Sequence, residues 1–473
     1  MAAASDTGSI DSLTISTCDV AIVGAGPGGL ATALALQKQG LHVQVFEQRT
    51  EFRPTGVAVF IWPHGLQHLK TIDAATCDRV INAGAPINQI AIDRLDPGST
   101  DPEELLTINV AGWSTRMDLP PQIGITWARL TNALREGLDE NTIQLGHTLK
   151  DVTEYQGNYS YDAQNESSGV LLTFAPTRDG KPAPPSVRAR LCVVGADGRN
   201  SKVREAVFDD VDSSNAKINV IPEALSSAPQ ANVYYALSPN PPPGGNGAAC
   251  RNELRFSLCD GSGISLLDVG RGNLDLNESG KEIRLSADAE NKSRDGQVMF
   301  GTTRFSEPSK TFETPVDRLN HLKGLFTKTT PLLRAAIDST DANEVVQTQL
   351  FERDGAKEWS KGRVVLLGDA AHCMYPSLGL GISTAFADAV ELSKNIELGR
   401  NSETKSTIET SLAMYSRIRA PNAWLLQMLS RIMHSVLAST SEKPKSDNSS
   451  NTFDPSRAFF KLWQGALWVF GDR

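Results

Sequence analysis

A glycine-rich turn between a short strand and a helix restricts the fold of this chain more than any other feature. The turn spans residues 24–29. The apolar run at 19–23 predicts a buried strand, residues 30–39 predict a helix, and residues 42–47 predict a second strand. A strand, turn, helix and strand within about 30 residues open a parallel, nucleotide-binding sheet. We therefore expect an α/β fold.

The spacing within the turn is that of a dinucleotide-binding fingerprint. Gly24, Gly26 and Gly29 form G-x-G-x-x-G. The first glycine permits the tight turn, the second lets the backbone approach a pyrophosphate, and the third allows close helix–strand packing. Glu47 stands 18 residues after Gly29, at the end of the second strand. A carboxylate there can accept hydrogen bonds from both hydroxyls of an adenosine ribose, which makes the pattern far more specific than the glycines alone.

A second segment, residues 193–201, carries an aspartate into another glycine turn. Its sequence is VVGADGRNS, in which a buried strand ends at Asp197, and Arg199 and Arg204 follow. On its own, this segment is equally typical of an ordinary Asp-Gly turn.

A third segment, residues 362–382, combines a strand, an aspartate and a helix start. Residues 364–367 predict a strand that ends at Asp369, whose carboxylate can accept from a ribityl hydroxyl. A glycine-flanked loop then leads into a helix that begins near Gly381. The N-terminus of that helix can stabilise negative charge on a reduced ring system.

The three segments together resemble the single-component flavoprotein monooxygenases of group A, the aromatic-hydroxylase type. This family includes p-hydroxybenzoate hydroxylase, salicylate hydroxylase and zeaxanthin epoxidase. The resemblance rests on GAGPGG with Glu47, on GADGRNSKVR and on GDAAHCMYPSLGLG, in that order, and it spans roughly residues 18–400. Trp127-Ala-Arg129-Leu is similar to the family's flavin-contacting arginine at a helix start, and residues 359–363 add a further match.

The resemblance implies FAD as the cofactor and a role for each matching residue. Asp197 would touch the pyrophosphate region and help the nicotinamide gain access, and Asp369 would bind the ribityl chain. Pro376 would lie beside the isoalloxazine ring, on the side where oxygen reacts. The expected cofactor-binding residues are Gly24, Gly26, Gly29, Glu47, Arg49, Arg53, Gly56, Arg129, Asp197, Asp369, Gly381 and Ile382.

Three departures from the family pattern concern the flavin pocket. The chain has Gly56-Val57-Ala58 where Gly-Ala-Gly is frequent, Pro63-His64 where Pro-Asn is frequent, and Leu380 in place of a glutamine. They affect the fine shape of the pocket and hence the substrate, and they leave FAD binding intact.

The resemblance also implies the domain organisation. We expect a Rossmann-like FAD-binding domain of the glutathione-reductase type with a β-meander, a mixed-sheet substrate domain and C-terminal helices. Strands near 148–155, 170–174 and 187–194 predict the meander. The expected boundaries are a flexible tail at 1–17, an FAD-binding domain at 18–85, 112–214 and 346–400, a substrate domain at 86–111 and 215–345, and a C-terminal helical segment at 401–473 with a flexible linker at 439–453.

Composition narrows the partners and the compartment. The chain is 40% hydrophobic and 21% charged with a net charge of −9, which is typical of a soluble globular protein and argues against nucleic acid as a partner. No apolar run is long enough for a transmembrane segment, and the N-terminal residues lack a targeting pattern. The six cysteines contain no C-x-x-C pair. We expect buried free thiols, a reducing compartment and therefore a cytoplasmic protein.

A small-molecule substrate is the expected partner. His64 and His68 stand four residues apart on a predicted helix, but no third ligand is evident and we expect no metal site. The aromatic stretch at 459–470 is typical of a segment that packs on its own domain, with a peripheral membrane contact as the alternative. The sequence does not indicate the oligomeric state.

The function implied by the resemblance is an FAD-dependent monooxygenase that consumes NADPH or NADH. It would insert one atom of O2 into an electron-rich aromatic or olefinic molecule through a flavin C4a-hydroperoxide. The single glycine fingerprint is used for FAD, so the nicotinamide would bind transiently. No catalytic residue is evident, and Pro376, Tyr234 and Tyr235 are the candidates.

Two alternatives stay open at this point. A flavin-dependent halogenase or a reductase of the same fold is the first, although the W-x-W-x-I-P stretch of halogenases is absent. A non-catalytic flavin-binding regulator is the second, and the intact Asp197 and Asp369 segments argue against it.

Overall fold

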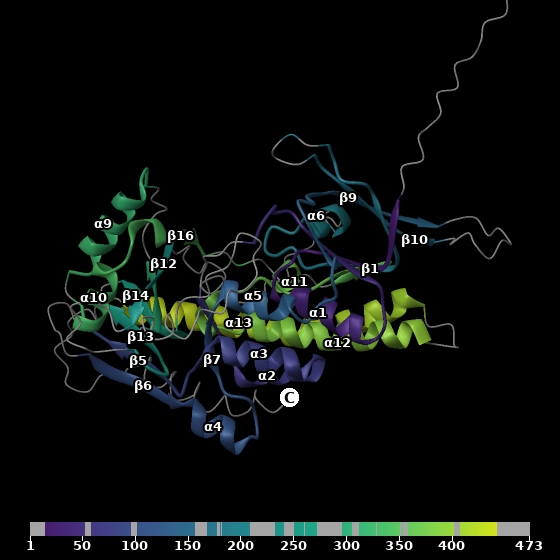
Figure 1. Ribbon diagram of the computed structural model, residues 1–473. Coiled ribbons are helices and arrows are strands. Elements are labelled where there is room, and N and C mark those ends of the chain that lie inside the picture. The colour runs from purple at the N-terminus through teal and green to yellow at the C-terminus, as the bar shows by residue number, and fades with distance from the viewer. Residues whose placement is uncertain are drawn as a thin grey trace, which may run out of the picture.

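The structure is a computed structural model with two large sheets and a small one between them (Figure 1). It describes residues 15–52, 58–95, 102–156, 168–176, 180, 182–208, 232–240, 250–259, 261–271, 296–304, 312–327, 329–350, 352, 358–401 and 407–441. Arg53, Gly56 and the aromatic stretch at 459–470 therefore lie outside the described residues.

The first sheet is the predicted nucleotide-binding sheet. Its main path has the order β17-β18-β11-β1-β2-β8, and β1 lies between β11 and β2 with parallel pairing on both sides. Continuous apolar runs bury the central strands β1, β11 and β18 on both faces, as parallel sheets require. The strands are β1 (Ser16–Val23), β2 (Val43–Glu47), β8 (Ile143–Leu145), β11 (Val187–Gly195), β17 (Ser360–Lys361) and β18 (Val364–Leu366).

An antiparallel meander extends this sheet, as the sequence predicted. The strand β9 (Leu149–Gln156) pairs with β10 (Ser168–Phe174), and β10 pairs with β11. The helix α6 (Lys202–Phe208) packs on β9. Figure 1 shows the meander and α6 at the end of the molecule opposite to α9 and α10.

A layer of helices packs against the parallel strands. The helix α1 contacts α12 through small residues, since Gly28 lies against Ala385, and α12 contacts both α2 and α13. The long helix α13 also contacts β13 and β14, so it reaches from the first sheet to the second (Figure 1). The helices are α1 (Pro27–Lys38), α2 (Pro63–Ile72), α3 (Ala74–Ala83), α5 (Trp127–Arg135), α12 (Gly381–Asn401) and α13 (Ile408–Ser441).

The second sheet has seven strands in the order β16-β12-β15-β14-β13-β5-β6. Its pairs are antiparallel except for β13 with β5, so it is a mixed sheet. The helices α9 (Pro315–Leu325) and α10 (Pro331–Asp338) cover one face. The strands are β5 (Gln89–Arg94), β6 (Glu103–Asn109), β12 (Asn232–Asn240), β13 (Glu253–Cys259), β14 (Ser262–Arg271), β15 (Gly296–Arg304) and β16 (Val346–Gln349), and α4 (Val110–Arg116) follows β6.

A three-stranded sheet joins the two large ones. It consists of β3 (Ala58–Ile61), β7 (Ile123–Thr126) and β4 (Ala85–Pro86). Gly124 in β7 brings the backbones together, because a Cβ at this position would lie 2.1 Å from the backbone oxygen of Asp268 in β14. Only glycine permits so close an approach.

Three expected boundaries were wrong. Ser16 and Thr17 were placed in the tail, but they pair with β11 as the start of β1. The strand β16 was placed in the FAD-binding domain, but it pairs with β12 in the mixed sheet. The linker was expected from residue 439, but α13 continues to Ser441, since the hydroxyls of Thr440 and Ser441 donate to helix carbonyls and both side chains are buried.

The cysteines match the sequence prediction. All six are free and buried. Burial raises the pKa of Cys192 to about 12, so this thiol is unreactive at neutral pH. In the part of the chain that the structure describes, no helix combines the length and the hydropathy that crossing a bilayer would require.

Candidate flavin site

The glycine turn has the geometry that a pyrophosphate requires. Gly24 has φ +108°, and a Cβ there would lie 2.3 Å from the backbone oxygen of Ala196. A Cβ at Gly29 would lie 2.2 Å from the backbone oxygen of Gly24. By contrast, a Cβ at Gly26, the N-cap of α1, would meet no described atom within 4 Å. Two glycines therefore close the turn, and the third leaves open space at a helix N-terminus, where an anion is stabilised.

Glu47 holds its carboxylate beside this turn. It lies at the end of β2, and its two oxygens accept from the backbone N–H groups of Ala25 and Arg49, each at 3.1 Å. The Arg49 side chain is exposed, and its backbone oxygen accepts from Gly146. The carboxylate is thus fixed at the edge of the turn with acceptor capacity left for sugar hydroxyls.

Asp369 lies at the start of a sharp turn at the end of β18. Gly368 has φ +60°, and the short helix α11 (Asp369–His372) follows. Asp369 is exposed although Ala370 and Ala371 are buried. Desolvation by the surrounding protein raises the pKa of this carboxyl group, and the charges of His372 and Arg199 oppose the rise. The carboxyl group is therefore accessible to a ligand.

The N-terminus of α12 is the second open backbone of the site. A Cβ at Gly381 would meet no described atom within 4 Å, and Ile382 is half-buried. The helix runs for 21 residues from Gly381. Its dipole and N–H groups can therefore stabilise negative charge placed against Gly381 and Ile382.

Asp197 has a structural explanation that involves no ligand. Its Oδ1 accepts from the hydroxyl of Ser201 at 2.5 Å, and its Oδ2 accepts from the backbone N–H groups of Lys202 and Val203 at 2.6 and 3.2 Å. The carboxylate therefore caps α6. Its own backbone supports the glycine turn, because the Cα of Asp197 lies 2.8 Å from the Cβ position of Gly24.

Arg129 is buried at the start of α5, which Thr126 caps. Its guanidinium donates to the backbone oxygen of Val269 in β14 at 2.7 Å, and burial lowers its pKa from the usual value. The side chain therefore ties the helix to the mixed sheet in this structure, between the parts expected to hold flavin and substrate.

The loop from Cys373 to Leu378 faces the mixed sheet and is held by hydrogen bonds from two helices. The indole of Trp62 donates to the oxygen of Leu378 at 3.0 Å, and the amide of Gln427 donates to that of Cys373 at 2.9 Å. The ring of Tyr375 stacks on His434 with 4.3 Å between centroids. Pro376 begins the 3₁₀ turn η2 (Pro376–Leu378) and is exposed.

The two candidate tyrosines lie on opposite faces of the mixed sheet. Tyr235 packs with Phe256, Met374 and Tyr375 on the face toward the loop. Tyr234 is fully buried against α9 and α10, with the rings of Phe312 and His321 beside it. Since successive strand residues face opposite ways, only Tyr235 of the two faces the loop that carries Pro376.

Sequence reasoning did not identify Asp388 and Arg419, which the structure places in a buried polar group with His372. Among the described residues no cluster of three or more potential metal ligands occurs. The nearby His64 and His68 have pKa values lowered to about 4, first of all by burial.

Direct contacts join all three sequence segments. Gly24 lies against Asp197 of the second segment, and a Cβ at Gly28 would lie 2.7 Å from Leu367 of the third. The guanidinium of Arg204 donates to the oxygen of Ala370 at 3.3 Å. A parallel sheet with an open glycine turn, a carboxylate at the end of the next strand and a second open helix N-terminus on adjoining segments is the architecture of Rossmann-type dinucleotide-binding proteins.

Comparison with known proteins identifies the family of this chain. Residues 17–257 and 331–430 match the family described as FAD binding domain, and the chain belongs to this family. Phenazine 1,6-dicarboxylic acid hydroxylase PhzS of Lysobacter antibioticus is 26% identical over 424 residues, which cover 86% of this chain and 88% of the relative. 6-Hydroxynicotinate 3-monooxygenase of Pseudomonas fluorescens is 25% identical over 420 residues, 87% of this chain and 90% of the relative.

Solved structures share the fold. Klebsiella pneumoniae HpxO, complexed with FAD and uric acid, superimposes with a TM-score of 0.64 at 19% identity and covers 95% of this chain and 92% of its own. p-Nitrophenol 4-monooxygenase PnpA from Pseudomonas putida gives 0.66 at 19% identity, covering 96% and 98%. The resemblance to aromatic-hydroxylase-type flavoprotein monooxygenases drawn from the sequence is confirmed.

Replacing Glu47 by glutamine is expected to weaken FAD binding. A hydrogen bond to a charged acceptor contributes about 1.5–3 kcal/mol, so the dissociation constant should rise about ten- to hundredfold. Titration of the deflavinated protein with FAD measures it. Glu51→Gln, on the same segment and exposed, is the matched control and should bind as the unmodified protein does. Equal affinities of both variants for FAD would show that Glu47 does not bind the cofactor.

Proposed function

We propose that this chain binds FAD across its three joined segments and uses it to insert one oxygen atom into a flat, electron-rich and largely apolar small molecule. The observation that supports this most is the direct contact of Gly28 with both Leu367 and Ala385. It packs the first turn of α1 against Leu367, two residues before the exposed Asp369, and against Ala385, four residues after Gly381.

Residues of this chain would hold each part of the cofactor. Glu47 would accept from the ribose hydroxyls, the α1 N-terminus would hold the pyrophosphate, and Asp369 would accept from the ribityl chain. The backbone of Gly381 and Ile382 would face the ring. When bound, FAD would supply hydride acceptance from NADPH or NADH and the activation of O2. The protein's contribution is to orient the ring, hold negative charge at the α12 N-terminus and exclude water.

The substrate class follows from the surface that faces the loop carrying Pro376. One apolar cluster lines both sides, the mixed sheet and the loop: Trp62, Tyr235, Phe256, Met374, Tyr375 and Leu378. Aromatic side chains bind planar rings by stacking and edge contacts. The names of two relatives give phenazine and nicotinate rings as their substrates, and HpxO is complexed with uric acid. Zeaxanthin epoxidase of rice is 24% identical over 436 residues, which cover 55% of that longer protein. We infer a substrate with a planar conjugated system.

The two tyrosines provide a test of this placement. We expect Tyr235→Ala to raise KM about tenfold or more, because a lost aromatic contact costs about 0.5–1.5 kcal/mol beyond its buried area. Tyr234→Phe should leave KM and kcat within about twofold, because Tyr234 lies on the opposite face of the sheet from the loop that carries Pro376. Steady-state kinetics with FAD-saturated protein measures both. A larger KM effect from Tyr234→Phe would place the substrate on the other face.

The activity itself is tested with purified protein. An oxidised-flavin spectrum, bleaching by NADPH or NADH without oxygen, and a product one oxygen atom heavier than a phenol, indole or polyene substrate would establish it. A product carrying a halogen would favour the halogenase alternative, and flavin that stays oxidised with every substrate would favour the binding regulator. We also propose a cytoplasmic location, where the six buried thiols stay reduced.

A further inference from the structure

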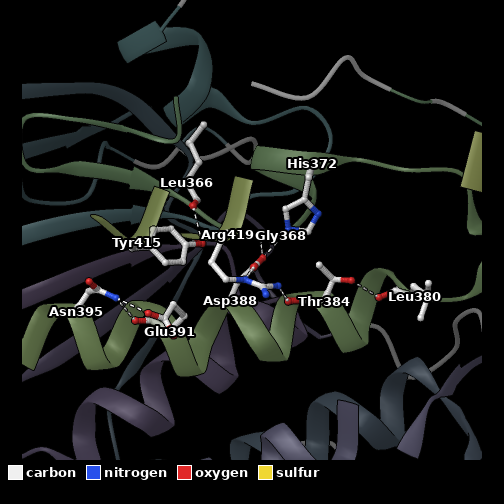
Figure 2. Close-up of polar contacts among 10 residues, drawn as sticks. All are labelled: Leu366, Gly368, His372, Leu380, Thr384, Asp388, Glu391, Asn395, Tyr415 and Arg419. Carbon is white, nitrogen blue, oxygen red and sulfur yellow. Dashed lines mark hydrogen bonds and ion pairs between the residues drawn. The ribbon is translucent and has the colours of Figure 1, made fainter. Parts of the chain in front are cut away.

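One buried carboxylate, that of Asp388, connects the elements that form the candidate flavin site. Asp388 lies in α12, seven residues after Gly381, and is 0% exposed. Its Oδ2 accepts from Nε2 of His372 at 2.5 Å and from the backbone N–H of Gly368 at 3.3 Å. Its Oδ1 accepts from Nε of Arg419 at 2.8 Å. Figure 2 shows Asp388 between the imidazole above it and the guanidinium beside it.

The charge states in this cluster follow from the contacts. Burial alone would raise the pKa of Asp388, but His372 and Arg419 together hold it down at about 2. The group is therefore a carboxylate and accepts only, so the proton between the pair lies on Nε2 of His372. The carboxylate and the guanidinium balance each other, and this is the arrangement in which a buried charge is tolerated.

The cluster reaches both groups that would contact the cofactor. Through Gly368 and His372, Asp388 holds the turn that carries Asp369. Arg419 also donates to the oxygen of Thr384, in the first turn of α12, at 3.3 Å.

Two aromatic residues pack around the cluster of Asp388, His372 and Arg419. The ring of Trp359 lies 5.0 Å from that of His372, and the hydroxyl of Tyr415 donates to the oxygen of Leu366, at the end of β18, at 3.2 Å. The turn and the helix start can therefore not move apart without breaking bonds to one buried ion pair.

We infer that Asp388 is a positioning residue for the flavin: it fixes the Asp369 turn relative to the N-terminus of α12 through His372, Gly368 and Arg419. This rests on the proposed function only as far as FAD binding. Removing the carboxylate would release the turn and leave the Arg419 cation without its counter-ion beside α12. Asp388→Asn should therefore weaken FAD binding and shift the flavin midpoint potential to more positive values, since an added positive charge favours the reduced, anionic ring.

The test compares four variants of the full chain: Asp388→Asn, His372→Gln, His372→Ala and Asn395→Ala. Glutamine places an amide nitrogen near the position of Nε2 and keeps the donor to Asp388. Asn395 is buried in the same helix, and its amide donates to the Glu391 backbone and side chain, each at 2.9 Å, so its loss reports on helix stability alone. Each variant is measured for FAD dissociation constant, midpoint potential, visible band shape and thermal midpoint.

Asp388→Asn and His372→Ala should raise the FAD dissociation constant about tenfold or more, the effect of one charge-assisted hydrogen bond. His372→Gln should stay near the unmodified protein, and Asn395→Ala should lower the thermal midpoint without changing FAD affinity or potential. Unchanged FAD affinity in His372→Ala would overturn the inference, even if Asp388→Asn does not fold. None of these readouts needs turnover; an unmodified chain that binds no FAD would instead refute the proposed function.

Discussion

Gly26→Ala is expected to give a folded protein that has lost most of its affinity for FAD. The backbone of Gly26 has φ −75° and ψ 171°, which alanine adopts freely, and its Cβ would meet no described atom within 4 Å. The methyl group would instead occupy the space into which the pyrophosphate approaches. Overpacking costs about 1–3 kcal/mol, so FAD binding should weaken about five- to 150-fold.

Gly29→Ala is expected to do the opposite and to destabilise the fold itself. Its Cβ would lie 2.2 Å from the backbone oxygen of Gly24, and backbone atoms cannot move aside as a flexible side chain can. This variant should lose stability even without FAD. Thermal unfolding of both deflavinated variants, followed by FAD titration, separates the two effects. Equal loss of stability in both would mean that Gly26 only closes the turn.

The contrast between the two glycines shows what the sequence alone could supply. The turn, the strand before it, the helix after it and Glu47 are all fixed within a short stretch, so local spacing predicted the elements and the carboxylate at the end of β2. The β-meander was predicted for the same reason, since its strands follow one another along the chain.

Contacts between residues far apart in the sequence could not be predicted from local spacing. Asp388 meets His372 and Arg419 across 16 and 31 residues, on three different elements, and no periodicity of α12 marks it out. Tyr234 and Tyr235 must face opposite ways in any strand, but which of them faces the loop depends on where α9 and α10 pack. Asp197 was predicted as a ligand contact, and its helix-capping bonds became visible only with the geometry of α6. Its contact with a ligand stays a prediction.

The largest effect of pH on the free energy of unfolding should come from two histidines in α2. His64 and His68 have pKa values lowered from 6.5 to about 4. Burial is the main cause for each, and His68 also lies near Arg419 and Lys394, which the charge of Asp388 only partly offsets. Among the described residues Nδ1 of His64 has no hydrogen-bond partner.

The sign follows from proton uptake. Between pH 6.5 and about 4, the unfolded chain binds protons on these histidines and the folded chain does not, so the free energy of unfolding falls as the pH falls through this window. Below about 4 both states are protonated and the loss is complete. Because one pKa unit corresponds to about 1.4 kcal/mol, and pH 5 lies 1.5 units below the ordinary pKa of each histidine, the pair should cost on the order of 4 kcal/mol at pH 5.

Urea unfolding at pH 7 and pH 5 measures this loss. The double variant His64→Gln, His68→Gln should lose much less stability between the two pH values, whereas His42→Gln, an exposed histidine, should behave as the unmodified protein does. Equal losses in the double variant and the unmodified protein would show that other groups carry the acid sensitivity.

The same histidines connect acid to the cofactor. The helix α2 begins at Pro63, directly after Trp62, whose indole holds the loop at Leu378 and whose backbone N–H donates to Ser383 in the first turn of α12. Protonation that loosens α2 should therefore also loosen the flavin site. Release of FAD, followed by its free fluorescence, should begin in the window between pH 6.5 and 4 in the unmodified protein and at lower pH in the double variant. If the double variant released FAD over the same pH range, α2 would not transmit the charge of its histidines to the site.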